Sequence, residues 1–123
     1  MQTPNKLLSR LLYCYLLINK TKMEQGAVKL IINAIPNKEN MLEVQTYLGN
    51  MIPVISANGG SVVTRYKTLA QLTGENGPEM VVIFEFPNAE AIKTMMSSEG
   101  FSNLSESRAK AFTKLNMMIC GEM

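Results

Sequence analysis

The 123-residue chain is 46% hydrophobic and 18% charged, which fits one folded domain with its own core and excludes a disordered chain. It contains no His and no Asp, which excludes Ser-His-Asp and Cys-His catalysis and the usual imidazole metal sites. Its net charge of +2 is concentrated in residues 1–22, which hold basic residues and no acid, so the remaining body lacks the basic character of a nucleic-acid-binding protein.

Residues 1–22 combine basic residues with an apolar run from Leu11 to Ile18. The run resembles a signal peptide only loosely, because it is short and no small-x-small cleavage site follows. It is also shorter than the roughly 20 apolar residues that span a bilayer. We expect an N-terminal extension over 1–22, disordered or outside the fold, and one domain over 23–123. A membrane-surface helix is the alternative for the extension.

Two cysteines, Cys14 and Cys120, occur without a CxxC spacing. This usage favours a reduced protein of the cytoplasm.

The organised pattern begins with a predicted strand over Gly26–Ile35, which Pro36 ends. Asn37 is a plausible N-cap for an amphipathic helix that reaches about Ala57. Asn58-Gly59-Gly60 is a typical helix stop. The residues expected on the apolar face of this helix are Met41, Val44, Leu48, Met51, Ile52 and Ile55.

The second half of the chain predicts strands over Ser61–Lys67, Met80–Phe86 and Lys114–Cys120. A turn-rich connection, with its tip at Gly74–Pro78, joins the first two. Between the last two, a helical region from Asn88 to about Lys110 is expected to break near Gly100. The order strand, helix, strand, strand, helix, strand predicts an α+β, ferredoxin-like βαββαβ fold: a four-stranded antiparallel sheet with both helices on one face.

Glu85 lies inside the apolar strand Met80–Phe86. If Met80, Val82, Phe84 and Phe86 face the helices, Glu85 shares the other face with Val81 and Ile83. That face is too apolar to be left in water and yet carries charge, so we expect a second copy of the chain to cover it. Glu85 would then pair with Lys29 or Arg65. The alternative is a solvated Glu85 on an open sheet.

Two positions in this pattern stay open. The strand Ser61–Lys67 gives the second face either Arg65 or the alternate set with Thr64 and Tyr66. The last strand gives it either Asn116, Met118 and Cys120 or Leu115, Met117 and Ile119.

The segment FEFPNAEAIKTMMSSEGFSNLSESR, residues 84–108, resembles the domain-of-unknown-function 1330 family, a branch of the dimeric α/β-barrel superfamily. The chain departs from the family pattern at Met95-Met96, where aromatics are usual, and at Glu99, where proline is usual. The positions that match the pattern are Phe86, Pro87, Glu90, Ala91, Ser98, Phe101 and Arg108, and Gly59-Gly60 resembles the double glycine of the family.

The resemblance implies a homodimeric α/β barrel, in a superfamily that contains cofactor-independent monooxygenases, isomerases, haem-dependent enzymes and members without known activity. Haem is not expected here, because the axial histidine is missing, and we expect no other cofactor and no metal. The candidate pocket or structural polar residues are Glu85, Arg65, Tyr66, Glu90 and Arg108.

Two of these candidates carry a structural alternative. Glu90 also suits the first turn of a helix, where an acid stabilises the dipole. Arg108 could clamp a substrate carboxylate or tie its own helix to a carboxylate such as Glu90.

The first functional hypothesis is a homodimer that binds a small organic molecule in a cavity between sheet and helices, with a cofactor-independent oxidation or isomerisation as the conceivable reaction. The second is a non-catalytic assembly or regulatory module, in which the same residues fix the geometry of the dimer. Whether the protein is an enzyme stays open at this point.

Overall fold

The computed structural model describes residues 27–123 of the chain. In this part the predicted order of strands and helices is confirmed, and the fold is ferredoxin-like. The elements are β1 (Val28–Pro36), the short 3-10 helix η1 (Lys38–Asn40), α2 (Met41–Ala57), β2 (Ser61–Lys67), β3 (Met80–Phe86), α3 (Ala89–Met96), α4 (Glu99–Ser102), α5 (Ser105–Ala111) and β4 (Phe112–Cys120). The expectations for residues 1–22, and the start of the domain at 23, lie outside the described residues.

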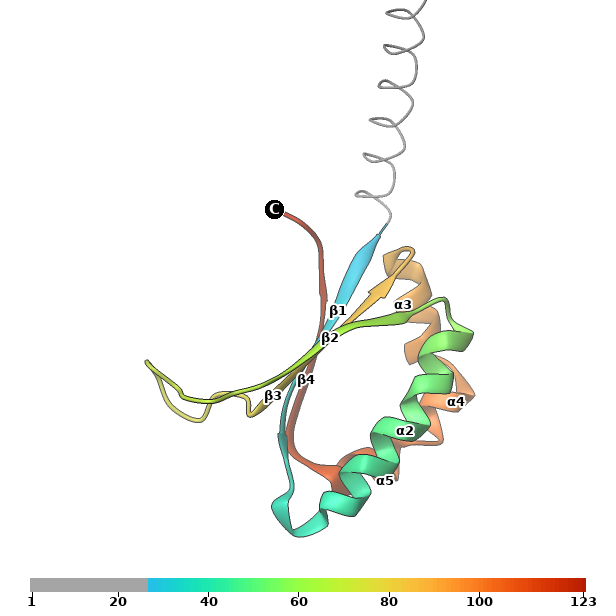
Figure 1. The fold of residues 1–123 in the computed structure, drawn as a ribbon. Helices are drawn as coiled ribbons and strands as arrows, with labels where there is room; N and C mark the ends of the chain where they lie inside the picture. The colour runs from blue at the N-terminus through green and yellow to red at the C-terminus, as the bar shows by residue number, and fades with distance from the viewer. Residues whose placement is uncertain (1–26) are drawn as a thin grey trace, which may run out of the picture.

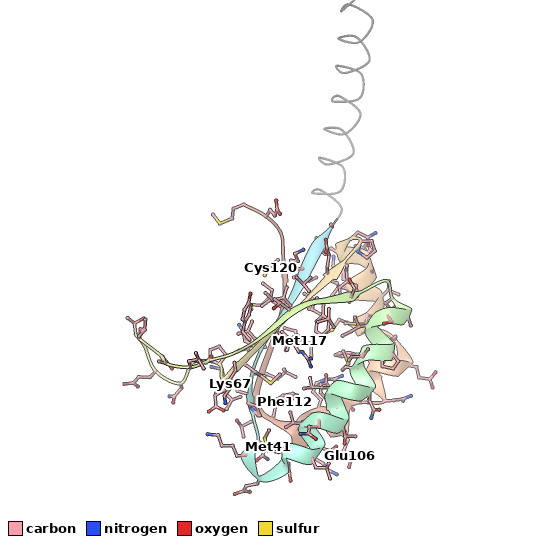
Figure 2. All side chains as sticks on the ribbon, in the orientation of Figure 1. Met41, Lys67, Glu106, Phe112, Met117 and Cys120 are labelled. Carbon is pink, nitrogen blue, oxygen red and sulfur yellow. The ribbon has the colours of Figure 1, made fainter. Side chains whose placement is uncertain are left out.

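The four strands form one antiparallel sheet in the order β2-β3-β1-β4. The helices of residues 27–123 all cover one face of this sheet, and no helix of these residues lies on the opposite face (Figure 1). Figure 2 shows Phe112 and Met117 on the helix side of β4. The molecule therefore has two layers, and its core lies between them.

Side-chain caps begin some of the helices. The Asn37 side chain accepts a hydrogen bond from the backbone N–H of Glu39 at 3.1 Å, but it caps η1 and not the long helix for which it was predicted. The N-cap of α2 is Asn40, whose side chain makes no cap bond. The Asn88 side chain accepts one from the backbone N–H of Ala91 at 2.8 Å and begins α3. These polar caps fix the points at which the chain leaves β1 and β3 and turns back over the sheet.

The second helical region breaks near Gly100, as expected, although Gly100 itself lies inside α4. One break is at Ser97 and Ser98, between α3 and α4, and the other is at Asn103 and Leu104, between α4 and α5. Ser98 Oγ donates to the carbonyl of Met95 at 2.6 Å and accepts from the backbone N–H of Phe101 at 3.2 Å. The Ser98 side chain therefore caps the start of α4 with a hydrogen bond that a glycine has no side chain to make.

The buried stripe of α2 differs from the predicted one. Met41 and Ile52 are 46% and 47% exposed, whereas Tyr47 is only 2% exposed. The residues of α2 that are fully in the core are Val44, Tyr47, Met51 and Ile55. Tyr47 packs edge to face on Phe112, with ring centroids 5.5 Å apart.

A register shift in β2, between Val62 and Thr64, settles the first open position. Arg65 lies opposite the buried Val82, and Tyr66 lies opposite Val81. Arg65 therefore belongs to the helix side of the sheet and Tyr66 to the bare side. In β4, Met118 is opposite Ile31 and Asn116 is opposite Asn33, which settles the second.

We call the bare side the helix-free face. Its residues are Lys29, Ile31, Asn33, Ile35, Ser61, Thr64, Tyr66, Val81, Ile83, Glu85, Lys114, Asn116, Met118 and Cys120.

Candidate functional site

A cavity of about 180 Å³ lies between the sheet and α2. Its walls are almost entirely apolar. They include Ile32, Val82, Phe84 and Leu115 from the sheet and Leu48, Met51 and Ile55 from α2. These side chains do not completely fill the space between α2 and the sheet, and the unfilled space is the cavity.

The mouth of the cavity lies between α2 and the edge strand β2. Three of the lining residues there, Ile52, Val62 and Arg65, are exposed to solvent. Among the described residues, Arg65 is the one charged side chain of the lining, and no ion pair of residues 27–123 includes it. A guanidinium at the rim of an apolar cavity can donate hydrogen bonds to a carboxylate or another anionic group of a bound molecule.

The Arg108 side chain is held beneath the helices by three contacts. Its Nε donates to the hydroxyl of Tyr47 at 2.9 Å, and its terminal nitrogen donates to the carbonyl of Phe101, also at 2.9 Å. The guanidinium also lies over the Phe101 ring, 3.7 Å from its centroid. Arg108 thus ties α5 to α2 and α4. Of the two readings of Arg108, the structure favours the tie, although its partners are a phenol and a carbonyl and not the carboxylate of Glu90.

Tyr47 lines the cavity and was absent from the sequence-based candidates. Burial raises the pKa of its hydroxyl above the ordinary value of 10.0, and the hydrogen bond from Arg108 and the charge of Arg108 oppose this increase. The phenol therefore stays protonated at neutral pH and can donate a hydrogen bond. The signal for it was present, because Tyr47 lies three residues after Val44 and four before Met51, on the same helical stripe.

Glu85 lies on the helix-free face and has a partner there. Its Oε1 is 3.4 Å from Nζ of Lys29, the residue directly opposite on β1. Arg65, the other partner considered, is on the opposite side of the sheet. Both side chains of the pair are still 39–45% exposed in the single chain, so the pair is worth about 0.2–1 kcal/mol there.

Glu90 lies on the surface, in the first turn of α3, and its carboxylate is 3.5 Å from Nζ of Lys93. It contacts neither Arg108 nor the cavity. The five candidates therefore occupy separate places: Arg65 at the cavity, Glu85 and Tyr66 on the helix-free face, Glu90 on the outside of α3, and Arg108 between the helices.

Within residues 27–123, no group of three or more side chains is arranged to hold a metal ion. No helix of this part has the length and apolar character needed to cross a membrane.

Several solved structures share this fold. A protein of unknown function from Rhodopseudomonas palustris matches with a TM-score of 0.68 and 17% identity, over 80% of this chain and 84% of that one. A dimeric protein of unknown function with a ferredoxin-like fold, from Bacteroides fragilis, matches with a TM-score of 0.50 and 12% identity, over 80% and 98%. At these identities the likeness shows the fold alone.

A third structure, from Bacteroides thetaiotaomicron, is named as a candidate antibiotic biosynthesis monooxygenase. It matches with a TM-score of 0.53 and 11% identity, over 81% of this chain and 90% of that one. No curated protein sequence matches the chain significantly. A family model described as "Domain of unknown function (DUF1330)" matches residues 30–123.

Proposed function

Because this chain belongs to the DUF1330 family, whose description assigns no activity, we propose a function from its site: the protein is a homodimer that binds a small organic molecule in the cavity between the sheet and α2. The observation that carries this proposal is an apolar cavity with one cation at its mouth, Arg65, that has no ion-pair partner among residues 27–123. The same proposal places the protein in the cytoplasm, because its two cysteines, Cys14 and Cys120, lack a CxxC spacing and are typical of a reduced protein.

The size and lining of the cavity define the ligand. An apolar cavity of about 150 Å³ is enough to hold a benzene ring, and this one measures about 180 Å³. The ligand is therefore a single aromatic ring or a short branched chain. Arg65 favours a carboxylate or similar anionic group on the end that faces the mouth, and the protonated Tyr47 can donate to an acceptor on the ligand.

Binding is better supported than catalysis. No carboxylate of residues 27–123 lines the cavity, and Tyr47, with its raised pKa, is a poor base at neutral pH. A cofactor-independent oxidation or isomerisation would have to remove a proton from the substrate without a general base. The related monooxygenase candidate shares the fold at 11% identity, which does not carry an activity to this chain.

The homodimer is supported by the helix-free face. Ile31, Val81 and Ile83 form an apolar strip across the two central strands, beside the Lys29–Glu85 pair. A relative with this fold is described as dimeric. A second sheet packed on this face would remove the strip from water and would strengthen the ion pair by excluding solvent.

The second candidate function is a non-catalytic assembly module. It is favoured by the positions of Glu85 and Tyr66, which lie on the helix-free face and not in the cavity. In this reading the dimer itself is the functional unit, and the cavity is only a packing defect.

Titration with two probes, benzoate and toluene, tests the binding proposal. We expect saturable chemical-shift changes in the amide NMR spectrum at cavity residues with both. Arg65→Gln should weaken benzoate binding about tenfold and change toluene binding less than about twofold, because only benzoate has a charge for the guanidinium. Leu48→Phe should weaken both, because the larger ring fills the cavity.

The controls for this titration are circular dichroism and sedimentation of each variant, which should show a folded protein of unchanged mass. A wild-type dimer that binds neither probe would overturn the binding proposal and leave the assembly module. Equal benzoate affinity in wild type and Arg65→Gln would remove the role of Arg65.

A further inference from the structure

The connection between β2 and β3, residues 68–79, is an ordered arm and not a loose loop. Its base is closed by two bonds from Thr68, whose N–H donates to the carbonyl of Glu79 at 2.9 Å and whose Oγ1 donates to the carbonyl of Pro78 at 2.6 Å. Its tip is closed by Gln71, whose side chain accepts from the N–H of Gly77 at 2.9 Å and donates to the carbonyl of Thr73 at 3.1 Å. The arm therefore holds its shape by its own hydrogen bonds.

Two leucines on this arm are left in water. Leu69 is 92% exposed and Leu72 is 91% exposed. A hydrogen-bonded loop that keeps two large apolar side chains away from its own core presents a surface suited to burial against another molecule. Of the two acidic residues of the arm, Glu79 is 3.4 Å from Lys38 at the base, and Glu75 is exposed near the tip.

The direction of the arm indicates the partner. The arm continues past the ends of β2 and β3 and projects to the side of the sheet opposite the helices (Figure 1). That is the side on which the proposed second copy would cover the helix-free face. The arm is therefore continuous with the surface that the homodimer would bury.

The area of the helix-free face also calls for an additional contact. Four strands spaced about 4.8 Å apart and about 23 Å long give a projected area of roughly 440 Å². Side-chain relief makes the accessible area somewhat larger, but a stable dimer typically buries about 800 Å² on each partner. A contact from outside the sheet would bring this interface to the usual size.

We propose that residues 68–79 form a clasp that reaches over a second copy of this chain and buries Leu69 and Leu72 against it. This inference rests on the proposed homodimer and adds the element that makes the dimer stable. Each protomer supplies one arm, because a two-fold axis relates the two copies.

The test compares two double variants by sedimentation equilibrium over a concentration series. Leu69→Ser/Leu72→Ser removes the apolar surface of the arm. Met41→Ser/Leu42→Ser is the matched control, because it removes two exposed apolar side chains, 46% and 78% exposed, from the first turn of α2 on the helix side. We expect the arm variant to raise the Kd of the dimer at least about tenfold and the control to leave it within about twofold.

Hydrogen exchange gives a second readout that does not need a variant. In the wild type, the arm amides between Leu69 and Asn76 should exchange more slowly above the Kd of the dimer than below it. A dimeric wild type with an unchanged Kd in the arm variant and no concentration-dependent protection would overturn the clasp and leave the homodimer standing. A wild type that is monomeric at all concentrations would overturn the homodimer as well.

Discussion

Tyr47 and Arg108 lie 61 positions apart in the sequence, and their hydrogen bond joins a buried phenol to a half-buried guanidinium at the edge of the apolar core. The guanidinium satisfies the phenol oxygen and the carbonyl of Phe101, so burial leaves neither acceptor without a donor. Replacement of either partner would leave the other without its bond. This pair fixes the position of Tyr47 at the wall of the cavity.

The raised pKa of Tyr47 predicts a specific dependence of stability on pH. The folded protein holds the phenolic proton more tightly than the unfolded chain, so the contribution of Tyr47 is fully present below the unfolded pKa of 10.0 and is lost as pH rises above it. Tyr47→Phe should be less stable than wild type at neutral pH by about 1–2 kcal/mol, because Arg108 loses an acceptor. The gap should narrow as the pH rises past 10.0.

Urea unfolding of both proteins at several pH values measures this gap, and the comparison cancels the titration of the other tyrosines and the lysines. A gap that stays constant across pH 10.0 would show that Tyr47 does not titrate differently in the folded state.

At the scale of elements, the turn from α2 into β2 depends on Gly60. A Cβ at this position would stand 2.6 Å from Ile55 and 2.6 Å from the Phe86 ring, both in the core. We expect Gly60→Ala to lower the free energy of unfolding by about 1–3 kcal/mol, because the core cannot yield without strain.

Gly49→Ala is the matched control for that substitution. A Cβ at Gly49 meets nothing within 4 Å, and the residue lies in the middle of α2. Alanine there should raise the free energy of unfolding by about 0.5–1 kcal/mol. Chemical denaturation measures both free energies of unfolding. An equal change for the two substitutions would contradict the close packing around Gly60 at the end of α2.

The sequence predicts the elements well wherever one period extends over a whole segment. In β3 the alternation places Phe84 and Phe86 in the core and Glu85 on the other face, as observed. In β2 alternation alone did not decide whether Arg65 or Tyr66 lies on the helix-free face. The register shift between Val62 and Thr64 decides it, and a local pattern does not reveal such a shift. The break expected near Gly100 is found at Ser97 and Ser98, where the Ser98 side chain caps α4, and a second break follows at Asn103 and Leu104.

The candidate site was less accessible to sequence analysis than the fold. The contact of Arg108 with Tyr47 joins segments far apart in the chain, and the cavity depends on how closely α2 approaches the sheet. Neither follows from a local pattern. Of the five candidates, Arg65 lies at the cavity. Glu85 lies elsewhere, and its ion pair with Lys29 accounts for a charge inside an apolar strand.

For the molecule as a whole, the proposed dimer depends on what covers the helix-free face. In a single chain the face exposes an apolar strip and a half-exposed ion pair to water. In a dimer the same strip would be buried, and the Lys29–Glu85 pair would contribute more than the small amount typical of an exposed pair.

Sedimentation equilibrium of the full chain at micromolar concentration, alongside Ile83→Arg, tests this most directly. Ile83 lies opposite Ile31 at the centre of the helix-free face, so an arginine there would introduce an unpaired charge between the two sheets. The account predicts twice the 13.7 kDa chain mass for the wild type and the single mass for the variant. A wild type that sediments as a single chain, or an Ile83→Arg variant that remains fully dimeric, would contradict it.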